Sequence, residues 1–347
     1  MSTNTQYNPN AELNARLLAA GASKTVYALI TPETESVKER VLGSNMGYGF
    51  KDNNRRQYLQ QFRDAWTGKQ DHYHEDFFQT WIEWSKPVID FNPALFPYYY
   101  PTAGASEALR HLIYDFAIKG GKTIHVFEGE YEGYKAMAEA ARLAVVEHPR
   151  SIIPSVGSQF FYDGIFIISQ PSAIDGNVWQ DFNQFIQQMP DHSVIVDLTY
   201  VGAVPPAAIK QKFDITDSSI RNVVFSLSKP FGTYYDRIGG VFSREEDLGL
   251  FGNRWFKNLT SLAIGTALMK QFKVFDFPEF YGTTQTNALA EVSEKLNLTN
   301  CQPCDVFILA SGGQTDTNLS DYLSRAGKLR LCLTPKMAEM IGTSGEL

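Results

Sequence analysis

The sequence predicts an α/β protein, with a three-layer domain built on a mostly parallel sheet and a smaller α+β domain formed by both chain ends. Between about residues 100 and 245, short apolar runs alternate with segments of helical period. Strands that alternate with helices favour a parallel sheet covered on both faces. The last hundred residues add helices and two strand-like runs, and 347 residues suffice for about two domains.

Five apolar runs in the middle of the chain are predicted to be buried strands: Thr123–Phe127, Gly164–Ser169, Ser193–Asp197, Asn222–Leu227 and Ile238–Phe242. Residues 106–119 carry apolar side chains at three- and four-residue steps, which predicts a helix with one apolar face. The alanine-rich residues 133–145 predict a second helix. Further helices are expected near residues 257–273 and 285–297, and further strands at Asp305–Ala310 and Lys328–Leu333.

These elements divide the chain into three segments. Residues 61–250 are expected to form the large domain. Residues 1–60 and 251–347 are expected to form the N-terminal and C-terminal parts of the small domain.

The composition excludes several classes of protein. With 44% hydrophobic and 20% charged residues, the chain is typical of globular proteins. A net charge of −7 without a dense Lys/Arg run argues against nucleic-acid binding. We find no secretory signal and no apolar stretch of membrane-spanning length, so a cytoplasmic protein is expected. Cys301 and Cys304 lack a second ligand pair, so we expect reduced thiols and no metal.

Reactive side chains follow two of the predicted strands, at the sheet edge where parallel sheets bind ligands. Asp197 ends the third strand and Tyr200 comes three residues later. Lys229 follows the fourth strand, and Arg237 comes eight residues after it. Burial at such a position lowers the pKa of an amine and favours the neutral nucleophile. Taken by itself, Lys229 is more typical of the start of a solvated loop.

The segment Ser226–Lys229, followed by Arg237–Gly239, resembles the lysine segment of pyridoxal-phosphate enzymes of the aspartate aminotransferase fold (fold type I), Ser-x-[Ser/Ala]-Lys and then Arg-x-Gly. Other blocks of this family occur in the same order between residues 44 and 330. They resemble the phosphate loop, the aromatic stacking segment, the Asp-x-x-Tyr block, the C-terminal arginine segment and, weakly, a stretch of histidinol-phosphate aminotransferases: Thr102–Leu109, Glu130–Tyr134, Val196–Tyr200, Leu329–Leu331 and Ser44–Gly49.

This resemblance implies pyridoxal 5′-phosphate as the cofactor. The implied catalytic residues are Lys229, which binds the cofactor covalently and moves a proton, Asp197, which pairs with the ring nitrogen, and Tyr200, which donates to the ring oxygen. The implied cofactor-binding residues are Gly104, Ala105, Ser106, Tyr131, Asp197, Tyr200, Ser226, Lys229 and Arg237. A helix N-terminus at Gly104–Ser106 suits the phosphate. The implied substrate-binding residues are Arg330, for a carboxylate, and Asn45.

One block departs from the family pattern. The family usually has an Asn that donates to the ring oxygen, and Ala173 stands at that position, within residues 169–177. An alanine side chain has no donor, so Ser172 and Asn177 are the alternatives for this role.

The resemblance favours a homodimeric aminotransferase that acts on an α-amino acid and a 2-oxo acid. The departure at Ala173 motivates an alternative, a β- or γ-lyase or a cyclase, for example on an arginine derivative in specialised metabolism. A cofactor-binding regulatory module is a third alternative, although the sequence shows no basic helix-turn-helix.

Overall fold

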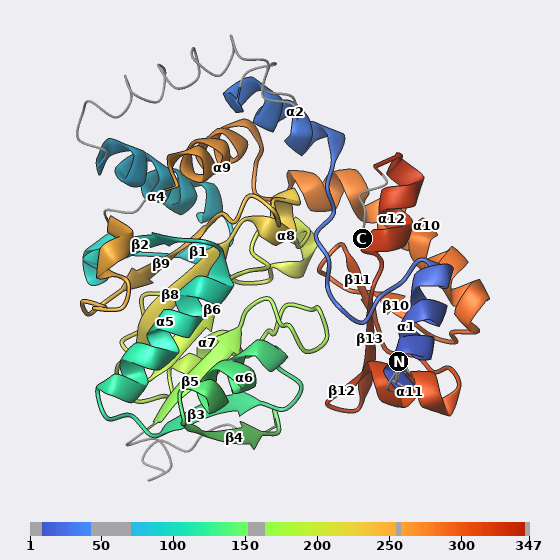
Figure 1. Cartoon of the computed structure of the whole chain (residues 1–347), viewed down its shortest axis with the longest axis horizontal. Helices are drawn as coiled ribbons and strands as arrows, with labels where there is room; N and C mark the ends of the chain where they lie inside the picture. Colours follow the sequence, from blue (N-terminus) through green and yellow to red (C-terminus); the bar gives the residue numbers. More distant parts are fainter. Residues whose placement is uncertain (1–8, 43–70, 152–163, 255–257, 344–347) are drawn as a thin grey trace, which may run out of the picture.

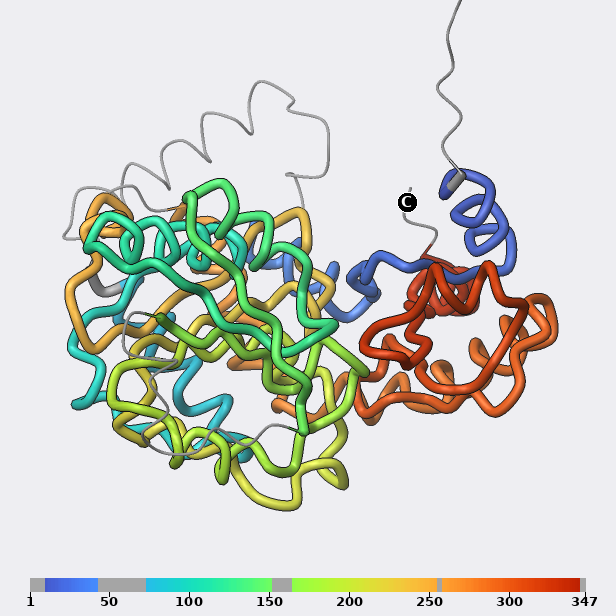
Figure 2. Tube along the Cα trace, turned by 90° about the horizontal axis from the view of Figure 1, so that it is seen from below, coloured from blue at the N-terminus to red at the C-terminus, as the bar shows by residue number. Residues whose placement is uncertain are grey.

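The computed structural model describes residues 9–42, 71–151, 164–254 and 258–343, which form a three-layer α/β domain beside a smaller α+β domain, as predicted (Figures 1 and 2). A seven-stranded sheet of order β2-β9-β8-β6-β5-β3-β4 forms the middle layer. β9 is antiparallel to both of its neighbours, and the other pairs are parallel. The strands are β2 (Tyr98–Thr102), β3 (Thr123–Phe127), β4 (Ala144–His148), β5 (Gly164–Ser169), β6 (Val194–Asp197), β8 (Ile220–Ser226) and β9 (Gly239–Ser243).

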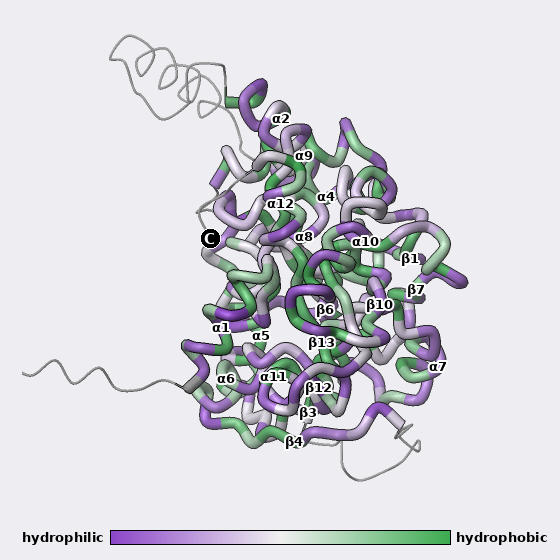
Figure 3. The backbone as a smooth tube through the Cα atoms, turned by 90° about the vertical axis from the view of Figure 1, so that its right-hand side faces the viewer, coloured by the Kyte–Doolittle hydropathy of each residue, from purple (hydrophilic) through white to green (hydrophobic). Residues whose placement is uncertain are grey.

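Alternate residues of each central strand face opposite helical layers. On β3, Ile124 and Val126 belong to the apolar cluster formed with α5 (Ala105–Ile118) and α6 (Glu132–Ala140). Phe127 belongs to the cluster on the other face, which includes α4 (Asp71–Ser85), α7 (Phe182–Ile186) and α9 (Leu259–Gln271). Burial on both faces explains why these strands are continuously apolar. Figure 3 shows hydrophobic segments gathered in the interior of the molecule.

The small domain combines both ends of the chain. Its antiparallel sheet has the order β10-β11-β13-β12. Its elements are β10 (Gln302–Pro303), β11 (Leu309–Ser311), β12 (Ser324–Arg325), β13 (Lys328–Cys332), α10 (Asp276–Leu296), α11 (Thr317–Leu323), α12 (Thr334–Ile341) and α1 (Pro9–Ala20). α1 packs against α10 and α11 (Figure 1). After α1, Ser23 forms an antiparallel bridge with Cys332 of β13, with N···O distances of 3.0 and 2.8 Å.

The remaining elements connect these parts. α2 (Pro32–Leu42) packs against α9, which also contacts α4, and α8 (Ser228–Phe231) follows β8. β1 (Ile89–Asp90) pairs with β7 (Phe213–Asp214), and short 3-10 helices cover Pro93–Leu95, Pro206–Ala208 and Phe251–Arg254. The division at residues 60 and 250 stays a prediction. No helix in the described part of the chain has the length and apolar composition needed to cross a membrane.

Three predicted elements differ from the structure. The helix expected near residues 285–297 is longer, because α10 begins at Asp276. The helix expected over residues 133–145 ends at Ala140, and Ala144–His148 forms β4, because Arg142 adopts a φ of 60° and the next residues pair with β3. Within the strand expected at Asp305–Ala310, only the last two residues join β11. The N–H groups of Val306 and Phe307 instead donate to loops of the large domain, 2.9 Å away in each case. That run is apolar because it is buried, and not because it is a strand.

Candidate active site

A cavity of about 310 Å³ lies where the large domain meets the small one. It is open to the carboxyl ends of β5, β6 and β8 and to the start of α5. Every predicted site residue in the described part of the chain lines it: Gly104, Ala105, Ser106, Tyr131, Asp197, Tyr200, Ser226, Lys229, Arg237 and Arg330. Asn45 lies outside the described residues. The structure thus brings these side chains together, while their chemical roles stay predictions.

Lys229 places its amine in this cavity from the start of α8. Its Nζ donates to the backbone carbonyl of Val26, 2.6 Å away, on the segment between α1 and α2. Burial lowers the pKa of Lys229 to about 8, and the nearby guanidinium of Arg330 acts in the same direction. A substantial fraction of this amine is therefore neutral near physiological pH.

Asp197 ends β6 with a buried carboxylate that accepts three hydrogen bonds. Tyr134 donates its hydroxyl to Oδ2 at 2.8 Å. Thr199 donates its N–H and its hydroxyl to Oδ1, at 3.0 and 2.5 Å. Burial raises the pKa of Asp197, and these three donors limit the rise. A carboxylate has about four acceptor positions, so one on Oδ2 is left for a further donor.

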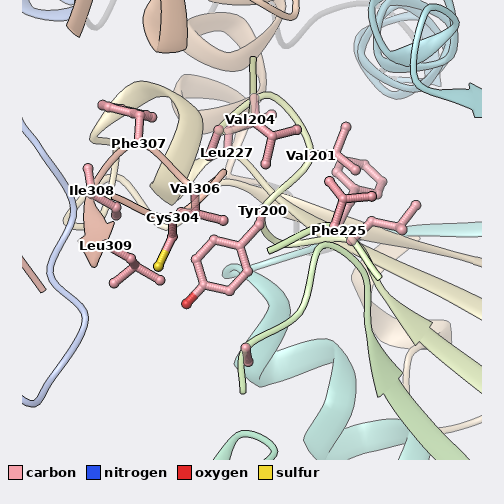
Figure 4. Close-up of a cluster of buried hydrophobic side chains, with 14 of the residues drawn as sticks. Tyr200, Val201, Val204, Phe225, Leu227, Cys304, Val306, Phe307, Ile308 and Leu309 are labelled. Carbon is pink, nitrogen blue, oxygen red and sulfur yellow. The ribbon is translucent and has the colours of Figure 1, made fainter. Parts of the chain in front are cut away.

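Two tyrosines of the cavity differ in exposure. Tyr200 lies in a buried cluster with Val306 and Leu309 of the small domain (Figure 4), and burial raises its pKa to about 12. Its hydroxyl is therefore a proton-bearing donor at neutral pH. Tyr131 is 42% exposed, and its ring meets the edge of Tyr134 at a centroid distance of 5.4 Å. Tyr131 thus lines the cavity with a ring that is partly open to solvent.

The start of α5 and Arg237 form an end of the cavity suited to an anion. The N-cap residue of α5 is Gly104, which has no side chain to accept from the N–H groups of the first turn. Arg237 lies directly against it and donates through Nη2 to the carbonyl of Ala103 at 2.6 Å. A Cβ added to Gly104, at a φ of 77°, would lie 3.0 Å from Nη2 of Arg237. A Cβ on Gly239 would lie 2.8 Å from the Gly104 Cα, which explains the glycine at the end of the Arg-x-Gly segment.

Two serine hydroxyls line the cavity next to this end. Ser226 and Ser228 lie within 2.9 Å of each other, and Ser226 also reaches the carbonyl of Ile238 at 3.2 Å. Each hydroxyl rotates to suit a partner, so the pair can add a donor beside Arg237.

Arg330 presents a buried guanidinium to the cavity. Its Nη1 donates to the backbone carbonyl of Ala173, and its Nε has no hydrogen-bond partner among the residues that the structure describes. A neighbouring guanidinium, that of Arg325, is already engaged by the backbone carbonyl of Glu130 at 3.2 Å and by the carboxylate of Glu132 at 3.1 Å. Of these two arginines, Arg330 is therefore the one with an unengaged edge for a ligand.

Ala173 lines the cavity, and the two residues expected to compensate for it do not. The hydroxyl of Ser172 accepts from Arg150. The amide NH₂ of Asn177 donates to the carbonyl of Asp175 at 3.2 Å, and its oxygen accepts from the N–H of Asp305 at 3.0 Å. Neither alternative therefore supplies the missing donor, because neither side chain lines the cavity.

A buried carboxyl group, that of Glu130, lies behind the same turn. It accepts from the N–H and the hydroxyl of Ser169, at 3.2 and 2.7 Å. Burial raises the pKa of Glu130 to about 7, and the bonds from Ser169 and the charge of Arg150 limit the rise.

Sequence reasoning missed several residues of the site. Glu130, Tyr134 and Thr199 stand inside blocks that the resemblance identified, so their positions were visible although their contacts were not. Arg325 and residues 24–26 lie outside every block, and only the folded chain brings them to the cavity. Among the described residues, no cluster of His, Cys, Asp or Glu is arranged to hold a metal ion.

Solved structures share this architecture at low sequence identity. A structure of MppP soaked with the product 2-ketoarginine matches with a TM-score of 0.65 and 9% identity, over 93% of this chain and 99% of that one. An aspartate aminotransferase mutant from Thermus thermophilus matches with a TM-score of 0.56 and 14% identity, over 99% and 98%. The chain has the aspartate aminotransferase fold.

The same fold occurs in a lyase. A pyridoxal-phosphate-bound C–S lyase from Staphylococcus hominis matches with a TM-score of 0.61 and 15% identity, over 99% of this chain and 94% of that one. No protein-family model matches the chain, and no curated protein matches it by sequence. Such low identities establish the fold and leave the reaction to be argued from the site.

Proposed function

We propose that this protein is a pyridoxal-phosphate-dependent aminotransferase that moves the amino group of an α-amino acid to a 2-oxo acid. The observation that carries the proposal is the presence, in one cavity, of a buried lysine amine and a guanidinium whose Nε has no partner among the described residues. The amine of Lys229 suits a carbonyl group, and Arg330 suits a planar carboxylate. Pyridoxal phosphate carries the first group and an α-amino acid carries the second.

The residues present fit this cofactor at three points. The uncapped start of α5 and Arg237 suit its phosphate, and a Cβ on Gly104 would intrude there. The remaining acceptor position on Asp197 suits the protonated ring nitrogen, and the aromatic ring of Tyr131, which lines the cavity, suits stacking on the cofactor ring. The pKa of Lys229, about 8, suits covalent attachment.

When bound, pyridoxal phosphate supplies an electron sink for negative charge that develops at the substrate Cα. Nζ of Lys229 would take the proton from that carbon and deliver it to the cofactor, which is the proton shift that transamination requires. Asp197 holds the proton on the ring nitrogen, and Tyr200 donates its hydroxyl to the ring oxygen. Arg330 orients the substrate by its carboxylate, so that the Cα proton faces the lysine.

Covalent trapping tests the attachment site. The purified protein incubated with pyridoxal phosphate is expected to show the absorbance band of a cofactor bound to a lysine. After reduction with borohydride, peptide mapping is expected to locate the cofactor on Lys229. Lys24 is the internal control, since its side chain lines the same cavity. Labelling of Lys24 in place of Lys229, or a colourless protein, would contradict the proposal.

A second candidate function is β- or γ-elimination or cyclisation, including chemistry on an arginine derivative. Two observations favour it: Ala173 offers no side-chain donor where the family has an Asn, and similar folds include a C–S lyase and the MppP structure with 2-ketoarginine. An amino-acid panel distinguishes the two candidates. Formation of 2-oxo acid that depends on an added oxo-acid acceptor supports the aminotransferase, whereas release or cyclisation of the side chain without an acceptor supports the second candidate.

We also propose that the protein acts as a homodimer in the cytoplasm. Tyr234 and Tyr235, beside Arg237, are 49% and 69% exposed, and such neighbouring aromatic side chains are typical of subunit interfaces. Light scattering during size-exclusion chromatography tests the dimer. A monomer at the concentrations at which the protein is active would contradict it.

A further inference from the structure

The turn that carries Ala173 is held by backbone hydrogen bonds on two sides. The N–H of Ala173 donates to Oγ of Ser169, 2.7 Å away, and its carbonyl accepts from Nη1 of Arg330. Ser169 ends β5 in the large domain, whereas Arg330 lies on β13 in the small domain. The backbone of Ala173 thus links the wall of the large domain to the guanidinium.

Glu130 sets the direction of the first of these bonds. Its Oε1 accepts from the N–H of Ser169 at 3.2 Å, and its Oε2 accepts from the hydroxyl at 2.7 Å. Because the hydroxyl proton points to Glu130, the lone pairs of Ser169 Oγ are available to the N–H of Ala173. Glu130 is only 5% exposed, so water does not readily replace these bonds. A fully bonded buried network of this kind fixes the geometry of its members.

The Ala173 carbonyl in turn determines which edge of Arg330 is offered to a ligand. A guanidinium is planar, with its donors in a rigid fork. Engaging Nη1 therefore fixes the direction of the Nε edge, which has no partner among the described residues. At residue 173 the backbone carbonyl orients Arg330, because the methyl side chain of alanine cannot form a hydrogen bond.

We propose that Glu130 is a positioning residue of this site, which orients Arg330 for the substrate carboxylate through Ser169 and the carbonyl of Ala173. This inference rests on the proposed function, in which Arg330 binds that carboxylate. Glu130 does not line the cavity, so it acts through these residues and not on the substrate itself.

The test compares Glu130→Gln, Ser169→Ala and the double variant, each as the cofactor-loaded protein. Glu128→Gln is the matched control, because Glu128 is an exposed glutamate on the same segment. The standard L-amino acids are first screened on the wild-type protein for a change in cofactor absorbance. The concentration giving half of that change is then measured for the responsive amino acid and for its carboxamide, which lacks the carboxylate.

In Glu130→Gln the half-saturating concentration of the amino acid is expected to rise about tenfold, as for the loss of one well-placed charged hydrogen bond. The value for the carboxamide and the affinity for the cofactor are expected to change less than about twofold. Both residues act through one chain of bonds. The half-saturating concentration of the amino acid in the double variant is therefore expected to be no higher than in the more affected single variant.

Three results would overturn the inference: Glu130→Gln behaving like Glu128→Gln, equal effects on the amino acid and the carboxamide, or effects of the single variants that add in the double variant. If Glu130→Gln does not fold, Ser169→Ala has to show the carboxylate-selective effect by itself, and its failure to do so refutes the inference. A loaded wild-type protein that responds to no amino acid refutes the proposed function instead, before any variant is compared, and the positioning role with it.

Discussion

Replacing Asp197 with Asn tests the proposed pairing with the cofactor ring most directly. The change removes one negative charge and keeps the volume of the side chain. The amide oxygen of Asn can still accept both bonds from Thr199, which are 3.0 and 2.5 Å long in the native protein. The amide NH₂ then faces the hydroxyl oxygen of Tyr134, which can accept. The local hydrogen bonds are therefore largely retained, and the charge is what is lost.

Asp197→Asn is expected to lower the reaction rate and, at higher pH, to raise the melting temperature relative to wild type. Loss of a hydrogen bond between charged groups corresponds to about 1.5–3 kcal/mol, which is about 10- to 150-fold in rate. The phosphate end is untouched, so the dissociation constant of the cofactor is expected to change less than about fivefold. Burial raises the pKa of Asp197 in the folded protein above its value in the unfolded chain. Ionising this carboxyl therefore costs folding free energy, and the wild-type protein loses stability as pH rises through the raised pKa. Asn does not ionise, and the variant is therefore expected to gain in melting temperature relative to wild type as pH rises.

Single-turnover kinetics of the half-reaction, cofactor titration and thermal melts measure the three quantities. Asp214→Asn is the matched control, because Asp214 accepts the same pair of bonds from Thr216, at 2.9 and 2.6 Å, and does not line the cavity. Equal losses of cofactor affinity and rate in Asp197→Asn, or the same behaviour as Asp214→Asn, would refute the assignment of Asp197 to the ring nitrogen.

Three further predictions concern other parts of the site. The rate of pyridoxal phosphate uptake by the apoprotein is expected to increase with pH and to level off above pH 8, because the pKa of Lys229 is about 8 and the neutral amine is the attacking form. Stopped-flow absorbance measures this rate, and a rate that does not depend on pH would contradict the prediction. Ala173→Asn is expected to lower the pH midpoint of the bound cofactor's absorbance by about one unit, since it adds a donor to the ring oxygen; an unchanged midpoint would show that another group already fills this position. Gly239→Ala is expected to weaken cofactor binding and lower the melting temperature, because its Cβ would lie 2.8 Å from the Gly104 Cα. Gly282→Ala, inside α10 and with open space around its Cβ, is expected to leave cofactor binding unchanged and to raise the melting temperature slightly; equal behaviour of the two variants would be contrary to this account.

The central fold could be predicted because strands buried on both faces are apolar throughout, as Gly164–Ser169 illustrates. The same signal fails at the sheet edge, where β4 is only partly buried and its alanine resembles the end of the preceding helix. It also fails for Val306 and Phe307, which are buried by loop contacts and not by strand pairing.

The candidate site was predictable where its residues follow strands. Asp197 and Lys229 fall next to apolar runs, and the order of the blocks identifies them. The carbonyl of Val26 and the side chain of Arg325 carry no such signal, because their place in the cavity depends on how the small domain closes on the large one. The contacts of Ala173 depend on backbone atoms, which are the same in every residue type except proline.

The bridge between Ser23 and Cys332 has a consequence for how the protein is made. Ser23 lies three residues before Val26, whose carbonyl accepts from Lys229, and its own backbone partner is on β13, near the other end of the chain. During synthesis the backbone of Ser23 has to wait, unpaired, until the ribosome has produced β13. Contacts between residues so distant in sequence form late and slow the folding reaction. The cavity is therefore among the last parts of the molecule to be completed, and cofactor uptake is expected to report the final step of folding.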